Sequence, residues 1–172
     1  MSSAADPVLR IPVGVVVERR KAESEWIDFV WRAVGILPGE PEMTAWTILR
    51  EQEEVTLFYV GSASIDLYRS EIPRYRDNLA SGAASIWVVM SPSEGQWPYT
   101  VTTATADPSE GESFTEAATN LVEPVPMPDI IREVIDRFIA GHHVEKEEFV
   151  KRTRRPADPE ALARRVLGEW DQ

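Results

Sequence analysis

Most apolar residues between positions 10 and 106 fall into short runs that are typical of β-strands. The runs are rich in β-branched and aromatic residues, and charged stretches or turns such as Pro38-Gly39 separate them. Gly61 interrupts one run, and we expect that strand to continue beyond it through a bulge or bend. The pattern predicts strands over residues 10–20, 29–37, 45–50, 55–60 with a continuation at 65–68, 85–90 and 97–106.

Helical signals lie between and after these runs. Pro73 opens a short helix at a position where its missing N–H costs nothing, and Gly82 follows as a C-terminal cap. A second helical stretch begins at Asp107-Pro108, and the proline-rich link VEPVPMP is predicted to be extended. Two further helices are predicted over residues 128–142 and 158–170, the first with an apolar stripe of Ile130, Ile131, Val134, Ile135, Phe138 and Ile139.

Strands that mostly follow one another through short turns favour an antiparallel sheet. A sheet of about six strands will curl, in this case towards a half-barrel. The sequence therefore predicts an α+β fold: a curled antiparallel sheet followed by C-terminal helices that pack on it. We expect a single α+β domain over residues 1–144 and a charged C-terminal extension with a terminal helix over residues 145–172.

The net charge of −11 is unevenly distributed along the 172 residues. Residues 1–144 carry 11 basic and 22 acidic side chains, whereas residues 145–172 carry 7 of each. An acidic body repels polyanions, so we expect no nucleic-acid partner. No apolar run approaches the roughly 20 residues of a membrane-spanning helix, so we expect no membrane partner.

Two further features bear on the compartment. The sequence has no cysteine, which excludes disulfides and thiolate metal sites and fits a reducing environment. Arg19-Arg20 does not form a twin-arginine export signal, because the apolar segment precedes the arginines instead of following them. We therefore predict a cytoplasmic protein.

Both histidines and the densest basic cluster lie in the segment HHVEKEEFVKRTRR, residues 142–155. His142 and His143 are adjacent, so on a helix their side chains diverge by about 100° and do not grip one ion. His143 and Glu147 share a helical face, but two ligands leave a metal site incomplete. We predict no metal, and the histidines suit a helix C-terminus. The KRTRR run is interpreted as a solvated charge run, a phosphate-binding patch or a docking peptide for an acidic partner.

The tryptophans suggest two interpretations, core packing or an aromatic ligand site. We expect Trp31, Trp46 and Trp87 in the core and Trp97 partly exposed beside a turn. The short helix at Pro73 carries basic residues that bind an anion or only solvate the helix. The candidate ligand-binding residues are Arg74, Arg76, Trp97 and Tyr99. The sequence has no nucleophile–base pair, phosphate-binding loop or dinucleotide-binding motif, so we predict no catalytic residue, no enzyme activity and no cofactor.

Several stretches together resemble a known family: IPVGVVVERR, WIDFVWRAVGILPGE, YRDNLASGAASIWVVM, TADPSEGESFTEA, VEPVPMPDII and HHVEKEEFVKR. The family consists of uncharacterised cytoplasmic proteins of proteobacteria, with a domain of unknown function. Its genes often neighbour those of molybdenum-dependent formate dehydrogenase. The resemblance runs from about Arg10 to Arg155 and implies a role in the assembly, cofactor insertion or composition of that enzyme.

We therefore predict a non-catalytic accessory protein of a formate dehydrogenase system. Its expected partner is a protein, namely a dehydrogenase subunit or one of its maturation factors. The predicted partner-binding residues are His142, His143, Glu145, Phe149, Lys151, Arg152, Arg154 and Arg155. Two alternatives stay open, a structural subunit of the complex and a curled sheet that binds a small ligand. The oligomeric state is left open as well.

Overall fold

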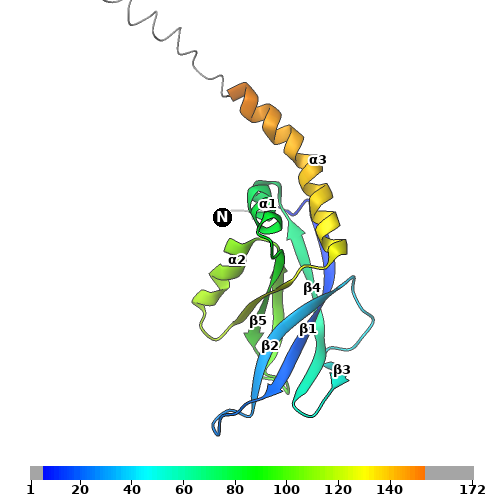
Figure 1. Cartoon of the computed structure of the whole chain (residues 1–172), viewed down its shortest axis with the longest axis vertical. Coiled ribbons are helices and arrows are strands. Elements are labelled where there is room, and N and C mark those ends of the chain that lie inside the picture. Colours follow the sequence, from blue (N-terminus) through cyan, green and yellow to red (C-terminus); the bar gives the residue numbers. More distant parts are fainter. Residues whose placement is uncertain (1–5, 154–172) are drawn as a thin grey trace, which may run out of the picture. The chain divides into compact units, whose positions relative to one another are not determined.

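The computed structural model describes residues 6–153, which form one sheet followed by helices (Figure 1). The strands are β1 (Leu9–Lys21), β2 (Phe29–Pro38), β3 (Thr47–Glu51), β4 (Val55–Leu67), β5 (Ser85–Pro92), β6 (Tyr99–Thr105) and β7 (Leu121–Pro126). The helices are α1 (Ile72–Ala80), α2 (Pro108–Ser113) and α3 (Asp129–Thr153), with 3₁₀ turns η1 (Arg69–Glu71) and η2 (Phe114–Glu116). The predicted α+β class is confirmed.

The sheet is a nearly closed half-barrel in which β4 has three neighbours. Along one edge, β4 pairs with β1 over its whole length. Along the other edge, it pairs first with β3 and then, at Ile65, with β6. Gly61 lies between these two contacts with a φ of 134°, and the register with β1 shifts beside it. Of the two alternatives predicted at Gly61, a bulge or a bend, the structure shows a bulge, and the predicted continuation of the strand is confirmed.

One pairing differs from the antiparallel sheet that we expected, because β4 and β6 run parallel. The strand order is β2-β1-β4-β6-β5-β7, so the chain leaves β4, passes through α1 and enters the sheet again two positions further along, at β5, which leaves one position between β4 and β5. Strand β6 then turns back into the gap between β5 and β4. As the antiparallel partner of β5, it takes the direction of β4.

The proline-rich stretch that the sequence predicted to be an extended link forms strand β7 of the sheet instead. It pairs antiparallel with β5, with Val125 opposite Ile86. Two residues later, the Met127 N–H donates to the carbonyl oxygen of Ala84 at 3.0 Å. Because backbone groups alternate in direction along a strand, the N–H groups of the odd-numbered residues point towards β5. The even-numbered Pro124 and Pro126 occupy positions whose N–H groups would point away from β5, so the missing groups break no hydrogen bond of this ladder. The strand was not predicted from the sequence because prolines are tolerated in a strand mainly at an edge that forms no ladder.

The half-barrel closes where β7 lies beside β2. Among the described residues, no backbone ladder joins these two strands. A side-chain contact spans them instead: Arg32 Nε lies 3.5 Å from Glu123 Oε1, and Glu123 Oε2 is buried without a hydrogen-bond partner in the described part of the chain. Burial raises the pKa of Glu123, and Arg32 opposes this effect only in part. This β2–β7 seam thus holds a partly desolvated carboxyl group.

The interior is filled by apolar side chains from the strands and from two helices. Tyr75 of α1 and Phe138 of α3 are buried with their ring centroids 6.3 Å apart. Figure 1 shows α1 and the first turns of α3 at one end of the strands. Within the predicted stripe of α3, Ile131 and Ile135 are buried, whereas Ile130 is 57% exposed. The amphipathic helix is confirmed, with a narrower buried face than its sequence suggested.

Helix α3 extends beyond its predicted end at His142, as far as Thr153. The sequence spacing Glu147–Lys151 and Glu148–Arg152 places opposite charges four residues apart, which favours a continued helix. The chain divides into two compact units, of which the first ends at Ile139 and the second begins at Ala140. The helix predicted over residues 158–170 lies outside the described residues.

We expect Gly111→Ala to destabilise the fold by about 1–3 kcal/mol, as overpacked core substitutions do. Gly111 of α2 faces Trp87 of β5, and an added methyl would lie 2.5 Å from the Trp87 Cβ and Cδ1 atoms. These atoms sit too close to the backbone to swing away. Chemical denaturation measures the change. Gly35→Ala is the matched control, since a methyl there meets nothing within 4 Å, and equal stabilities of the two variants would contradict the packing of α2.

We expect Glu123→Gln to raise the melting temperature relative to the wild type progressively as the pH rises above 4.5, the ordinary pKa of the group. A raised pKa means that the folded state binds this proton more tightly than the unfolded chain does. The stability associated with the proton is therefore lost as the pH rises through the folded-state pKa. Glutamine has no such titration. A difference between the two melting temperatures that does not change with pH would contradict the claim that burial at the β2–β7 seam raises the pKa of Glu123.

Candidate functional site

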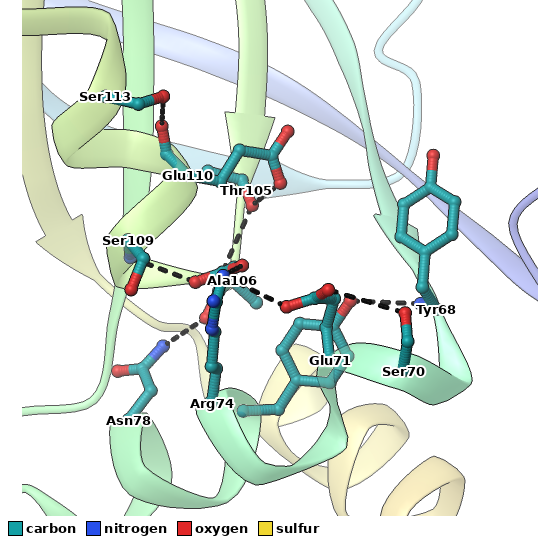
Figure 2. Close-up of polar contacts among 12 residues, drawn as sticks. Tyr68, Ser70, Glu71, Arg74, Asn78, Thr105, Ala106, Ser109, Glu110 and Ser113 are labelled. Atoms are coloured by element: carbon teal, nitrogen blue, oxygen red, sulfur yellow. Dashed lines mark hydrogen bonds and ion pairs between the residues drawn. The ribbon is translucent and has the colours of Figure 1, made fainter. Parts of the chain in front are cut away.

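The densest polar network surrounds Asp107, where β6 leads into α2 (Figure 2). The Asp107 carboxylate caps α2 by accepting a hydrogen bond from the Ser109 N–H at 2.9 Å. Its other oxygen accepts from Arg74 Nη1 at 3.0 Å, and the side chain is only 3% exposed. Arg74 also lies 3.2 Å from Glu71. The hydrogen bond and charge of Asp107, followed by the charge of Glu71, raise the pKa of Arg74.

Asn78 joins the same helix to two strands. Its amide nitrogen donates to the carbonyl oxygens of Ser85 at 2.8 Å and Ala106 at 3.0 Å, and its oxygen accepts from the Ser85 N–H at 3.0 Å. The side chain is buried, so all three bonds are shielded from water. Asn78 therefore fixes α1 against the start of β5 and the end of β6.

Two tyrosines complete this end of the molecule. Tyr75 accepts a hydrogen bond from the Tyr68 N–H at 3.0 Å, and burial raises the pKa of Tyr75 to about 12. The hydroxyl is therefore neutral at physiological pH. Burial, with smaller effects of Asp66 and Glu110, raises the pKa of Tyr68 as well. Tyr68 borders a hollow of about 40 Å³ between β4 and β6, which has room for a water molecule.

This network braces the fold, and its charges are directed at one another. Arg74, a predicted anion-binding residue, is held by two carboxylates. Arg76 lies exposed on the same helix. The described residues contain no group of three or more histidine, aspartate or glutamate side chains arranged to hold a metal. The role that these contacts support is structural, because they hold α1 and α2 in position.

The other predicted ligand-binding residues lie at the opposite end of β6. Trp97 stacks on Trp46 with ring centroids 4.8 Å apart and an interplanar angle of 8°. Tyr99, the first residue of β6, is half-buried against the core. Asp107, the partner of Arg74, follows Trp97 by ten positions in the sequence, so the length of β6 keeps Arg74 and Arg76 apart from Trp97 and Tyr99. The four side chains do not surround one shared site.

The five tryptophans among the described residues divide between the interior and the surface. Trp31, Trp46 and Trp97 are half-buried and pack against the core, and Trp46 adopts a left-handed φ of 68°. Trp87 is half-buried on the outer face against α2. Trp26, in the loop between β1 and β2, is 92% exposed. The sequence did not predict this exposure of Trp26. It also did not predict that the Arg19 side chain lies over aromatic rings. A signal for the position of Arg19 was present, because Val13, Val15, Val17 and Arg19 alternate along β1 and therefore lie on one face of it.

The predicted partner-binding residues lie at and beyond the end of the first unit. His142 is half-buried on α3. The backbone of His143, Glu145, Phe149, Lys151 and Arg152 continues the same helix. Arg154 and Arg155 lie outside the described residues. The partner-binding role of this segment stays a prediction.

The chain belongs to the family DUF3305, whose description is a protein of unknown function and whose model matches residues 12–154. This confirms membership of a family with a domain of unknown function, over nearly the same stretch as the resemblance seen in the sequence. No curated protein and no solved structure matches the chain. Among the described residues, no helix has the length and apolar character needed to cross a bilayer.

We expect Asn78→Ala to lower the free energy of unfolding by about 2–4 kcal/mol, because it leaves two carbonyl groups and one N–H buried without their partners. Asp77→Ala, one residue earlier on the exposed face of α1, is the control and should change stability by no more than about 0.5 kcal/mol. Urea denaturation of both variants measures the difference. A loss for Asn78→Ala no larger than that of the control would show that the brace contributes nothing.

Proposed function

We propose that this protein is a non-catalytic accessory protein that binds a protein partner through the segment His142–Arg155. The observation that carries the proposal is the length of α3. Ile131, Ile135 and Phe138 anchor its first turns in the core, yet the helix continues to Thr153, fourteen residues beyond Ile139. Residues 140–153 of α3 belong to the second compact unit, so the helix continues beyond the unit in which its first turns are buried.

The sequence of the segment suits recognition by another protein. A helical segment whose sequence contains an apolar residue such as Phe149 can bind in an apolar groove of a partner. Lys151, Arg152, Arg154 and Arg155 follow it closely, and arginine forks pair well with carboxylates. The partner that fits this chemistry has an apolar groove with acidic residues near one end.

The resemblance to a proteobacterial family supports a particular partner. Because genes of that family often neighbour those of molybdenum-dependent formate dehydrogenase, we propose a dehydrogenase subunit or one of its maturation factors as the partner. The protein then acts in the cytoplasm, in assembly of the enzyme. A structural subunit is the competing role, and it differs in requiring stoichiometric recovery with the active enzyme.

Affinity purification from the native host during growth on formate tests the proposal. Three tagged proteins are compared: the full chain, a variant that ends at His143, and a full-length variant with glutamine in place of Lys151, Arg152, Arg154 and Arg155. We expect dehydrogenase subunits or maturation factors, identified by mass spectrometry, with the full chain and at least tenfold less with either variant. Equal recovery with all three would place binding on the half-barrel, and recovery with none would remove formate dehydrogenase as the partner system.

A further inference from the structure

Strand β1 carries a row of side chains that ends in a cation. Val13, Val15 and Val17 are fully buried in the core. Arg19 follows on the same face, at the end of the half-barrel away from α1, where β1 turns into β2. Figure 1 shows this turn at the opposite end of the strands from α1. An arginine thus occupies the position where a further core residue would otherwise lie.

The Arg19 guanidinium rests on three aromatic rings. Its central carbon lies 4.5 Å from the ring centroid of Phe29, 5.1 Å from that of Phe58 and 5.9 Å from that of Trp31. These rings also contact one another, with Phe29 and Trp31 at 6.3 Å and Trp31 and Phe58 at 6.0 Å. Contacts between a cation and several ring faces fix the position of a long, flexible side chain.

The hydrogen-bond donors of this guanidinium are not used by the described residues. Among the described residues, Arg19 forms no ion pair with a carboxylate and donates no side-chain hydrogen bond. Its neighbour Arg20 differs, since Arg20 Nε donates to Glu18 at 3.1 Å on the other face of the strand. Arg19 is therefore a positioned cation whose planar set of N–H groups remains available to a ligand.

The surroundings of Arg19 are apolar and partly open. Trp31, Phe29 and the stacked pair Trp46–Trp97 are each half-buried. Ile48 of β3 lies opposite Phe58 in the sheet register and is 50% exposed. A ligand that reaches Arg19 would therefore meet ring faces and an aliphatic side chain as well.

We propose that this aromatic end of the half-barrel binds a small organic anion in which one carboxylate is attached to an aromatic or aliphatic group. The fork of Arg19 pairs with the two carboxylate oxygens, and the apolar part packs on Phe29 and Trp31. The cation–π contacts hold the fork in place before binding, which lowers the ordering cost. A single carboxylate fits better than a polyanion, because the net charge of the chain is −11.

Titration of 3-phenylpropionate into ¹⁵N-labelled full-length protein, followed by NMR, tests this site. We expect saturable shifts of the Arg19, Phe29 and Trp31 amides and a dissociation constant on the order of 1 mM, ordinary for a fragment of this size. 3-Phenylpropylamine has the same ring with the opposite charge and should not bind. Equal shifts with the amine, or no saturable shift with the acid, would overturn the proposal.

The variants separate a binding role for Arg19 from a structural one. Arg19→Gln should weaken binding of 3-phenylpropionate about tenfold or more, as expected for loss of hydrogen bonds to a charged group. Arg19→Lys keeps the charge without the fork and should bind with intermediate affinity. Arg20→Gln removes a charge from the same strand and should bind like the wild type. Equal weakening by Arg19→Gln and Arg20→Gln would reduce the effect to net charge and refute a site at Arg19.

The carboxylate could come from a free metabolite or from the C-terminus of a polypeptide. A tetrapeptide that ends in phenylalanine, with a free or an amidated C-terminus, distinguishes these sources. Tighter binding of the free-acid peptide than of 3-phenylpropionate would assign the site to a chain terminus, and weaker binding would assign it to a small acid. The site lies on the strands and does not involve residues 142–155, so its test stands apart from that of the proposed function.

Discussion

Closure of the half-barrel depends on how β2 and β7 meet without a backbone ladder. Pro124 and Pro126 remove two N–H groups from the edge of β7 that faces β2, so regular pairing is not possible there. The contact between Arg32 and Glu123 spans the gap, and the Glu123 carboxyl is partly desolvated as a result. The same prolines protect the edge from pairing with other chains. Only Met127 and Pro128 lie between β7 and α3, so the strand at this seam is connected almost directly to the helix that is proposed to bind a partner.

The two ends of the half-barrel are stabilised by different chemistry. At one end, Asn78 and Asp107 satisfy buried backbone groups and fix α1 and α2 to the strands. At the other end, β4 loses its contact with β6 and pairs with β3 instead, and the stacked rings of Trp46 and Trp97 pack at this end. At the polar end, the side chains of Asn78, Arg74 and Asp107 bond to other groups of the protein. At the aromatic end, no residue in the range 6–153 accepts a hydrogen bond from the Arg19 side chain, which is why a ligand site is proposed there and not around Arg74.

The sequence predicted those features that depend on neighbouring residues, and less of what depends on distant ones. The run Val15–Val17 and the run at residues 85–90 form buried strands, as their β-branched side chains indicated. Strand β7 was missed because prolines are unfavourable in a strand unless its free edge is known. The pairing of Arg74 with Asp107 joins residues 33 positions apart, and the rings beneath Arg19 come from β2 and β4. Neither set of contacts has a signal in local spacing, so the candidate sites could not be derived from sequence alone.

A half-barrel that is followed in the sequence by a long helix suits the proposed role, in which the helix binds a partner. The most direct test places a photo-crosslinking benzoylphenylalanine at position 149 of the full-length protein in its native host. Crosslinks from this position to a formate dehydrogenase subunit or maturation factor, absent when the same group replaces Trp26, are the predicted result. Crosslinks to these proteins from position 26 alone would contradict the account, because they would place the binding surface on the strands instead of on α3.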